Sequence, residues 1–173
     1  DPRRRLRMES LESRRVLASL VVTTNLDVVD AQDGELSLRE AVEQANSIPG
    51  PDTISFDSNR FSEASRIDLA LGQLQATDSV SIEGTGKDRL TIDAGGASRV
   101  FEFLSMDGDL SLSRITLTGG RTVGQDINTN QSGGGIRFAS GGTLTLDQVD
   151  LLEHQTQGSG AKGGGLFAEI GRA

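Results

Sequence analysis

The chain has 173 residues, the size of a single domain, and its six Phe with no Trp and no Tyr leave the core to small aliphatic side chains. The absence of Cys excludes disulfides and thiolate metal sites, and the single histidine, His154, excludes His-rich metal sites. Residues 1–17 hold six Arg and three acidic residues, whereas residues 18–173 hold eleven basic and 22 acidic ones, a balance that argues against nucleic acid as a partner. No run of about 18 apolar residues is present, so the sequence predicts no transmembrane helix.

Residues 1–20 are predicted to form a basic export or targeting segment without regular structure. Their arginines precede a short apolar run at residues 16–22, which is the order of a secretory signal, although the run is at the short end of the length that a signal needs. A frayed chain end is the alternative. The chain begins with Asp1, so Met8 is a candidate initiator, and the sequence does not decide whether residues 1–17 are cleaved.

Residues 21–53 are predicted to form an N-terminal cap with one amphipathic helix at residues 37–46. Ser37 and Glu40 have the spacing of a capping box. Apolar residues then follow at the spacing of one helical face, at Leu38, Ala41, Val42 and Ala45. The Pro-Gly-Pro sequence just beyond should end the helix, because the residue before a proline is biased away from the helical region.

From residue 54 onward the sequence changes to very short segments in which apolar and polar residues alternate, the pattern of β-strands. Each segment offers only two inward apolar residues, which is too few for a sandwich built from hairpins. The predicted strands are residues 54–56, 67–69, 80–82, 90–92, 101–103, 110–112, 115–117, 136–138, 144–146, 149–151 and 166–168.

Two repeats indicate how these strands are arranged. Residues 133–136 (GGGI) recur as residues 163–166 (GGGL) at an offset of 30, and residues 110–120 recur as residues 144–154 at an offset of 34. Stacked turns of a coil suit such repeats, because each strand then pairs with the same face in the turns before and after it. The expected fold is all-β: a right-handed parallel β-helix, or solenoid, over residues 54–173, with roughly four coils of three faces.

The two ends of this solenoid are expected to differ. An open end exposes unpaired strand edges and the core, so natural solenoids need a cap, and the helix is placed to be one. No equivalent follows the last predicted strand, so we expect further coils of the parent protein, or a partner, at that end.

The segment around the helix resembles a bacterial surface-protein module whose hallmark is Cys-Ser-Leu-Arg-Glu-Ala, followed by an Ala-Asn helix end and an Asp-Thr-Ile strand. Leu36 stands where that family often has Cys, so any disulfide of that Cys is absent. The matching residues are Ser37, Leu38, Arg39, Glu40, Ala41, Ala45, Asn46, Asp52, Thr53 and Ile54.

Two further resemblances concern the ends of the chain. The GGGI and GGGL repeats are similar to the β-helical repeats of polymorphic outer-membrane proteins, but Leu151 and His154 replace the Phe and Asn of that pattern. The N-terminal segment resembles the Leu-Glu-x-Arg-x-Leu-Leu-Ala motif of large exported planctomycete proteins, through Leu11, Glu12, Arg14, Leu17 and Ala18. All three resemblances imply an exported surface or extracellular protein, associated with the outer membrane, and none implies a reaction.

Catalysis was tested against the needs of polysaccharide-cleaving β-helices. A hydrolase needs converging carboxylates, for which the candidates are Asp88, Asp93, Asp107, Asp109, Asp147 and Asp150. A lyase needs a base, for which the candidates are Lys87, Lys162, Arg114, Arg121 and Arg137. The residue patterns of such hydrolases are missing, and His154 has no nucleophile near it in sequence, so it is predicted to be a surface or rung-end residue. No catalytic residue is predicted.

Calcium is the one cofactor that the sequence suggests. Oxygen-rich, flexible loops suit this cation, and aspartates gather in two of them. The candidate ligands are Asp27, Asp30, Asp33, Asp107 and Asp109. The alternative is that these residues are ordinary members of exposed turns.

The leading hypothesis is a non-enzymatic, exported β-helix that serves as a rigid stalk or adhesion module. Its expected partners are polysaccharide, cell-surface or matrix components, or further coils of its parent protein. A calcium-dependent polysaccharide lyase or hydrolase is the first alternative. A truncated gene product without independent function is the second.

Overall fold

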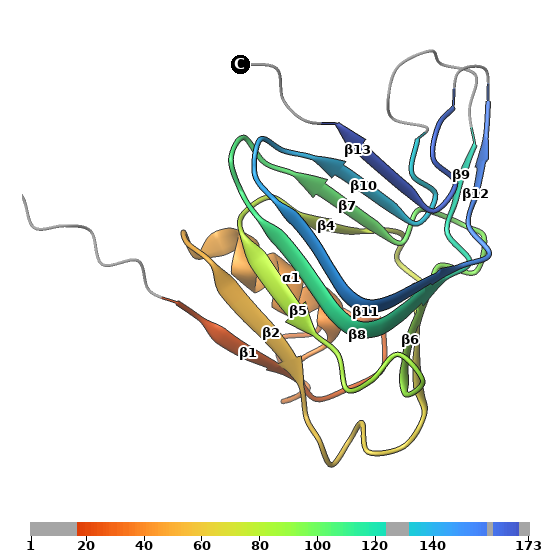
Figure 1. Cartoon of the computed structure of the whole chain (residues 1–173). Coiled ribbons are helices and arrows are strands. Elements are labelled where there is room, and N and C mark those ends of the chain that lie inside the picture. Colours follow the sequence, from red (N-terminus) through yellow and green to blue (C-terminus); the bar gives the residue numbers. More distant parts are fainter. Residues whose placement is uncertain (1–16, 124–131, 159–160, 170–173) are drawn as a thin grey trace, which may run out of the picture.

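The structure, a computed structural model, describes residues 17–123, 132–158 and 161–169. These residues form one helix and thirteen strands, arranged as a parallel β-solenoid of about five turns (Figure 1). The predicted all-β solenoid with one short helix is therefore confirmed, with about one turn more than expected. Residues 1–16 of the predicted export segment lie outside the described residues. The last two residues of the segment, Ser19 and Leu20, belong to the first strand, β1.

The first face of the solenoid contains one strand from each turn. These strands are β1 (Ser19–Val22), β2 (Asp52–Phe56), β5 (Val80–Glu83) and the first halves of β8 (Leu110–Thr118) and β11 (Leu144–Leu152). The second face contains β3 (Ser65–Asp68), β6 (Leu90–Asp93) and the second halves of β8 and β11. Because β8 pairs with both β5 and β6, the two faces form one continuous, bent sheet.

The bend in the two long strands is made by one residue in each. Arg114 in β8 and Gln148 in β11 both have φ of 54°, the left-handed region that non-glycine residues seldom adopt. Gln148 lies one turn after Arg114, because the strands are paired at an offset of 34 on both sides of the bend. The predicted segments 110–112 and 115–117 are thus one strand with a corner inside it.

The third face is a separate sheet of β4 (Leu74–Ala76), β7 (Phe101–Leu104), β10 (Ile136–Ala139) and β13 (Leu166–Glu169). A two-stranded ladder of β9 (Arg121–Val123) and β12 (Gln155–Gln157) leaves the corner after the second face. Both predicted offsets are the observed register: Ile136 pairs with Leu166, and Leu110 with Leu144. All eleven predicted strands overlap observed ones, whereas β1, β4, β9 and β12 were not predicted.

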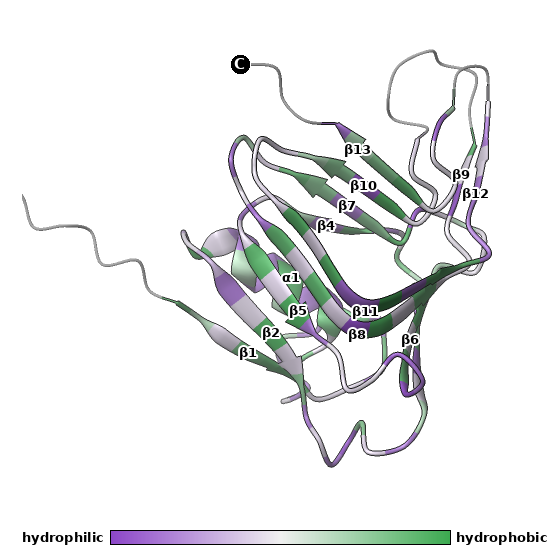
Figure 2. Ribbon diagram, viewed as in Figure 1, coloured by the Kyte–Doolittle hydropathy of each residue, from purple (hydrophilic) through white to green (hydrophobic). Residues whose placement is uncertain are grey.

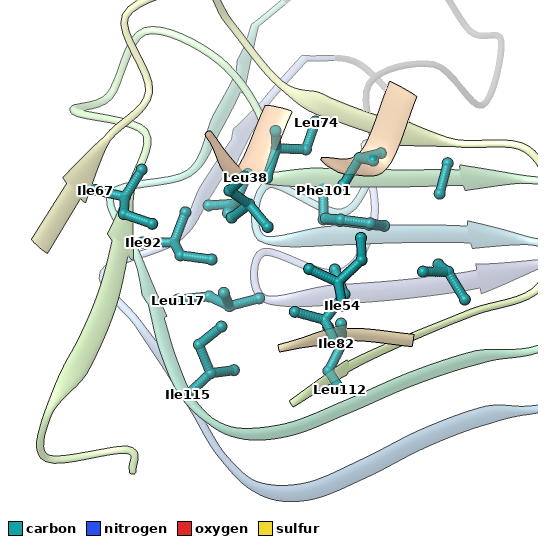
Figure 3. Close-up of a cluster of buried hydrophobic side chains, with 14 of the residues drawn as sticks. Leu38, Ile54, Ile67, Leu74, Ile82, Ile92, Phe101, Leu112, Ile115 and Leu117 are labelled. Atoms are coloured by element: carbon teal, nitrogen blue, oxygen red, sulfur yellow. The ribbon is translucent and has the colours of Figure 1, made fainter. Parts of the chain in front are cut away.

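The core is a set of aliphatic stacks between the three faces (Figure 3). Ile54, Ile82 and Leu112 follow one another on successive strands of the first face, and each is at most 1% exposed. On the third face the rings of Phe103 and Phe138 stack at 5.3 Å between centroids. Apolar and polar residues alternate along these strands (Figure 2). Burying each such side chain contributes about 1.5–3 kcal/mol, so small residues suffice when every turn repeats the contact.

Helix α1 (Leu38–Ser47) packs against β1, β2 and β4 through the predicted face of Leu38, Ala41, Val42 and Ala45. Its N-terminus has the predicted capping box: Ser37 Oγ accepts from Glu40 N–H at 3.1 Å, and Ser37 N–H donates to Glu40 Oε2 at 2.8 Å. Burial would raise the pKa of Glu40, but backbone hydrogen bonds from Ser37 and Asp30 outweigh it and lower that pKa. The helix runs one residue beyond the predicted end, to Ser47.

Candidate functional site

A groove lies at the corner between the second face and the β9–β12 ladder and is called here the corner groove. It has a volume of about 530 Å³. Three successive turns contribute to it, each through the residues that follow a strand of the second face. Four glycines and four polar residues line it: Gly95, Gly96, Gly119, Gly120, Asp93, Arg121, Glu153 and Gln155.

Glycine is needed at this corner because backbones and side chains approach closely. A Cβ at Gly119 would overlap Asp93 Oδ1, and one at Gly120 would overlap the carbonyl oxygen of Gly134. Gly119 has φ of 63°, and Glu153, its equivalent one turn later, keeps the same left-handed conformation at 55°. The corner therefore has a wall of exposed backbone with few side chains.

Asp93 is held in place by structural contacts. Its carboxylate forms an ion pair with Arg66 of the preceding turn, and its Oδ1 accepts from Gly95 N–H at 2.6 Å. Its side chain is 10% exposed. Asp93, a predicted catalytic candidate, thus joins two turns while facing the groove.

Arg121 is the cationic residue of the groove lining. One of its terminal nitrogens, Nη2, donates to Gln157 Oε1 at 3.0 Å. Its Nε is buried and has no hydrogen-bond acceptor in the structure, which is costly for a donor. The part of Arg121 that a ligand could contact is therefore not this atom.

His154, predicted to be a surface or rung-end residue, lies between Glu153 and Gln155 of the groove lining and is half-buried. Its Nδ1 accepts from Gly120 N–H at 3.0 Å, so the neutral ring carries its proton on Nε2, which is buried and without a partner. Burial lowers the pKa of His154 below its ordinary value of 6.5, against the opposing effects of a Leu117 backbone hydrogen bond and the Asp93 charge. The fold therefore favours the uncharged ring.

The stability of the fold is expected to decrease as the pH falls below about 6.5. In that range His154 takes up a proton in the unfolded chain but not in the folded chain. The free energy of unfolding stops decreasing once the pH is below the lowered pKa of His154 in the folded chain. The midpoints of urea unfolding at about pH 7.5 and about pH 5.5 would measure this loss of stability. The His154→Asn variant, whose amide oxygen stands at the position of Nδ1 and can still accept from Gly120, should lose less stability between the two pH values; an equal loss would contradict the assignment.

The predicted calcium ligand Asp27 is engaged elsewhere. Its oxygens accept from Arg39 Nε at 2.7 Å, from Arg39 Nη2 at 2.9 Å and from Leu71 N–H at 2.8 Å. The carboxylate side chain is 1% exposed. This pair fastens the loop before α1 to the second turn and leaves no open coordination site on Asp27.

The other four calcium candidates lie at turns. Asp30 and Asp33 each accept from the backbone N–H two residues later, at Gln32 and Glu35. Asp109 accepts from Thr143 N–H at 2.7 Å, and Asp107 is exposed. Within the described parts of the chain, no group of three or more His, Asp or Glu side chains could hold a metal ion. Calcium binding stays a prediction from sequence.

The remaining catalytic candidates are dispersed over the surface, except for the buried Arg137. Lys87 and Asp150 form an ion pair at 3.3 Å, and Arg114 lies 3.7 Å from Glu83. Three further candidates have exposed side chains: Asp88, Asp147 and Lys162. Two other candidates, Asp93 and Arg121, both line the corner groove.

A buried cluster of charges on the third face was not predicted. Glu102 Oε1 accepts from Arg99 at 2.8 Å and from Arg137 at 3.0 Å, and its Oε2 accepts from Gln73 at 2.7 Å. Arg99 also donates to the backbone of residues 132 and 133 in the next turn. The sequence signal that could have indicated this cluster is a charged residue between two apolar ones in β7 and in β10, namely Phe101-Glu102-Phe103 and Ile136-Arg137-Phe138.

This cluster continues to the N-terminal cap. Gln73 Oε1 accepts from Arg99 at 2.9 Å, and the Gln73 carbonyl accepts from Arg39 of helix α1 at 3.1 Å. Arg137 in turn lies 3.7 Å from Glu169 of β13. Polar contacts thus connect the helix to the last described strand along one side of the solenoid.

Comparison with known proteins places the chain among exported proteins. The family described as Planctomycete extracellular matches residues 2–19, the stretch that contains the predicted export motif. The match indicates an exported, extracellular protein. No curated protein and no solved structure matches the chain. Helix α1 has ten residues, and the described part of the chain holds no helix with the length and apolar character that crossing a bilayer requires.

Proposed function

We propose that the chain is a non-enzymatic module of an exported surface or extracellular protein, in which it acts as a rigid stalk or adhesion face. The observation that carries the proposal is the use of buried charge. Glu102, Arg99 and Arg137 join successive turns, and Arg39 joins the helix to the loop before it and to the second turn. Charges saturated in this way fix the stacking of the turns and are not available for proton transfer.

The export match and the helix motif support a surface location. Residues 2–19 match an extracellular family, and residues 37–41 resemble the opening of a bacterial surface module. We place the protein at the cell surface or in the extracellular matrix, associated with the outer membrane. Its partners are then matrix polysaccharides, or further coils of its parent protein.

The test is to incubate the purified full chain with acidic and neutral polysaccharides, once with calcium and once with chelator. Both retention of the protein and release of oligosaccharides are followed. We expect no oligosaccharide release under either condition, because Asp93, the catalytic carboxylate candidate in the corner groove, is held by Arg66 and by Gly95 N–H. Release of oligosaccharides that stops on chelation would overturn the proposal in favour of a calcium-dependent enzyme.

A further inference from the structure

We propose that the corner groove binds a neutral polysaccharide, and this inference rests on the adhesion role proposed above. The shape of the corner groove supports this inference. At about 530 Å³ the groove is within the range of small-molecule sites, and it is lined by residues of three successive turns. An elongated ligand lying along the solenoid axis would therefore contact each of these turns.

The side chains that line the corner groove suit a ligand rich in hydroxyls. Every side chain there is polar, so an apolar ligand would find no matching surface. Arg121 and Gln155 offer donors, and Asp93 and Glu153 offer acceptors. The hydroxyls of a sugar unit both donate and accept, so they can bond to the donors and to the acceptors of the groove lining.

Charge narrows the ligand class further. Asp93 is paired with Arg66 and Glu153 shares the lining with Arg121, so the groove itself has no large excess of either charge, whereas residues 18–173 hold eleven basic and 22 acidic residues. A uronate or phosphate polymer would be repelled by the acidic body of the chain, whereas a neutral glycan would not. The ligand class that fits both lining and charge is an uncharged polyol chain.

Glycines make a direct test possible. Gly96 lines the groove with φ of 73°, and a Cβ there would meet nothing within 4 Å. Asparagine tolerates this conformation better than other side chains do, so Gly96→Asn adds bulk to the groove without a clash. Gly34→Asn is the matched control, since Gly34 has φ of 75° and open space around its Cβ but is not part of the groove lining.

The experiment measures retention of the full chain by soluble dextran, mannan and polygalacturonate in affinity electrophoresis. We expect retention by a neutral polymer that weakens at least about tenfold in Gly96→Asn and in Glu153→Ala, and not in Gly34→Asn. Thermal unfolding of each variant checks that the fold is kept. Retention that is equal in all variants, stronger on polygalacturonate, or absent on both neutral polymers would overturn the inference.

These outcomes are separable from failure of the proposed function. Release of oligosaccharides by the unmodified chain would overturn the non-enzymatic role and leave the groove as a binding site. An intact chain that neither cleaves nor retains a neutral polymer would remove the groove inference and leave the structural role.

Discussion

Replacing Gly135 by alanine is expected to destabilise the fold by about 3 kcal/mol, a large part of the stability of a domain of this size. Gly135 precedes β10 at the point where three turns approach one another. A Cβ at this position would lie less than 3.0 Å from the carbonyl oxygen of Gly165 and from two ring atoms of His154. Neither the backbone nor the half-buried ring can move away without disturbing the neighbouring turn.

The chain contains its own control for this experiment. Gly165 is the equivalent residue one turn later, and the atoms nearest to a Cβ there belong to the Leu151 side chain at 3.8 Å, an ordinary contact. Gly165→Ala should therefore change the free energy of unfolding by less than about 1 kcal/mol. Urea unfolding followed by circular dichroism compares the two variants. Similar midpoints for both would refute the close approach described here.

The second large effect is expected at Glu102. Its carboxylate is shared by Arg99 and Arg137 on the third face, and all three residues are at most 7% exposed. Burial lowers the pKa of Arg99, and the charge of Glu102 opposes that shift. Glu102→Gln keeps the shape of the side chain but removes the negative charge between two buried cations, which should cost about 3 kcal/mol.

Glu83→Gln is the matched surface control. Glu83 lies 3.7 Å from Arg114, and the side chains of both are 47% exposed. Water and salt screen such a pair, so the change in unfolding free energy should stay within about 0.5 kcal/mol. If the Glu102 and Glu83 variants unfold at the same urea concentration, the buried cluster does not hold the turns together as described.

The repeating part of the fold was predictable because its signals are local. Ile54, Ile82 and Leu112 each belong to a short alternating segment, and the offsets of 30 and 34 in the sequence are the register of the strands. Ser37 and Glu40 likewise predict the start of the helix from neighbouring residues. The prediction missed β9 and β12, which contain few apolar residues and are paired with each other in adjacent turns. It also missed β4, a strand of only three residues in which Leu74 and Ala76 are buried.

The site was much less predictable, because turn lengths decide which residues meet. Asp93 and Arg121 were both noted as candidates, but no spacing rule indicates that residues of three turns line the same groove with Glu153. The surroundings of Asp27 were not predictable for a related reason. Asp27 has the sequence neighbours of a turn residue, while its partner Arg39 comes from the helix and buries it.

The shared strand β8 has a consequence for mechanics. Hydrogen bonds between parallel strands run across the strands, which in a solenoid means along the long axis of the molecule. A pull along that axis therefore loads the ladders of all three faces at once, and the bent strands carry two of these ladders in one piece of backbone. Tension is divided among many bonds of a turn, so the module should resist stretching until a whole turn detaches.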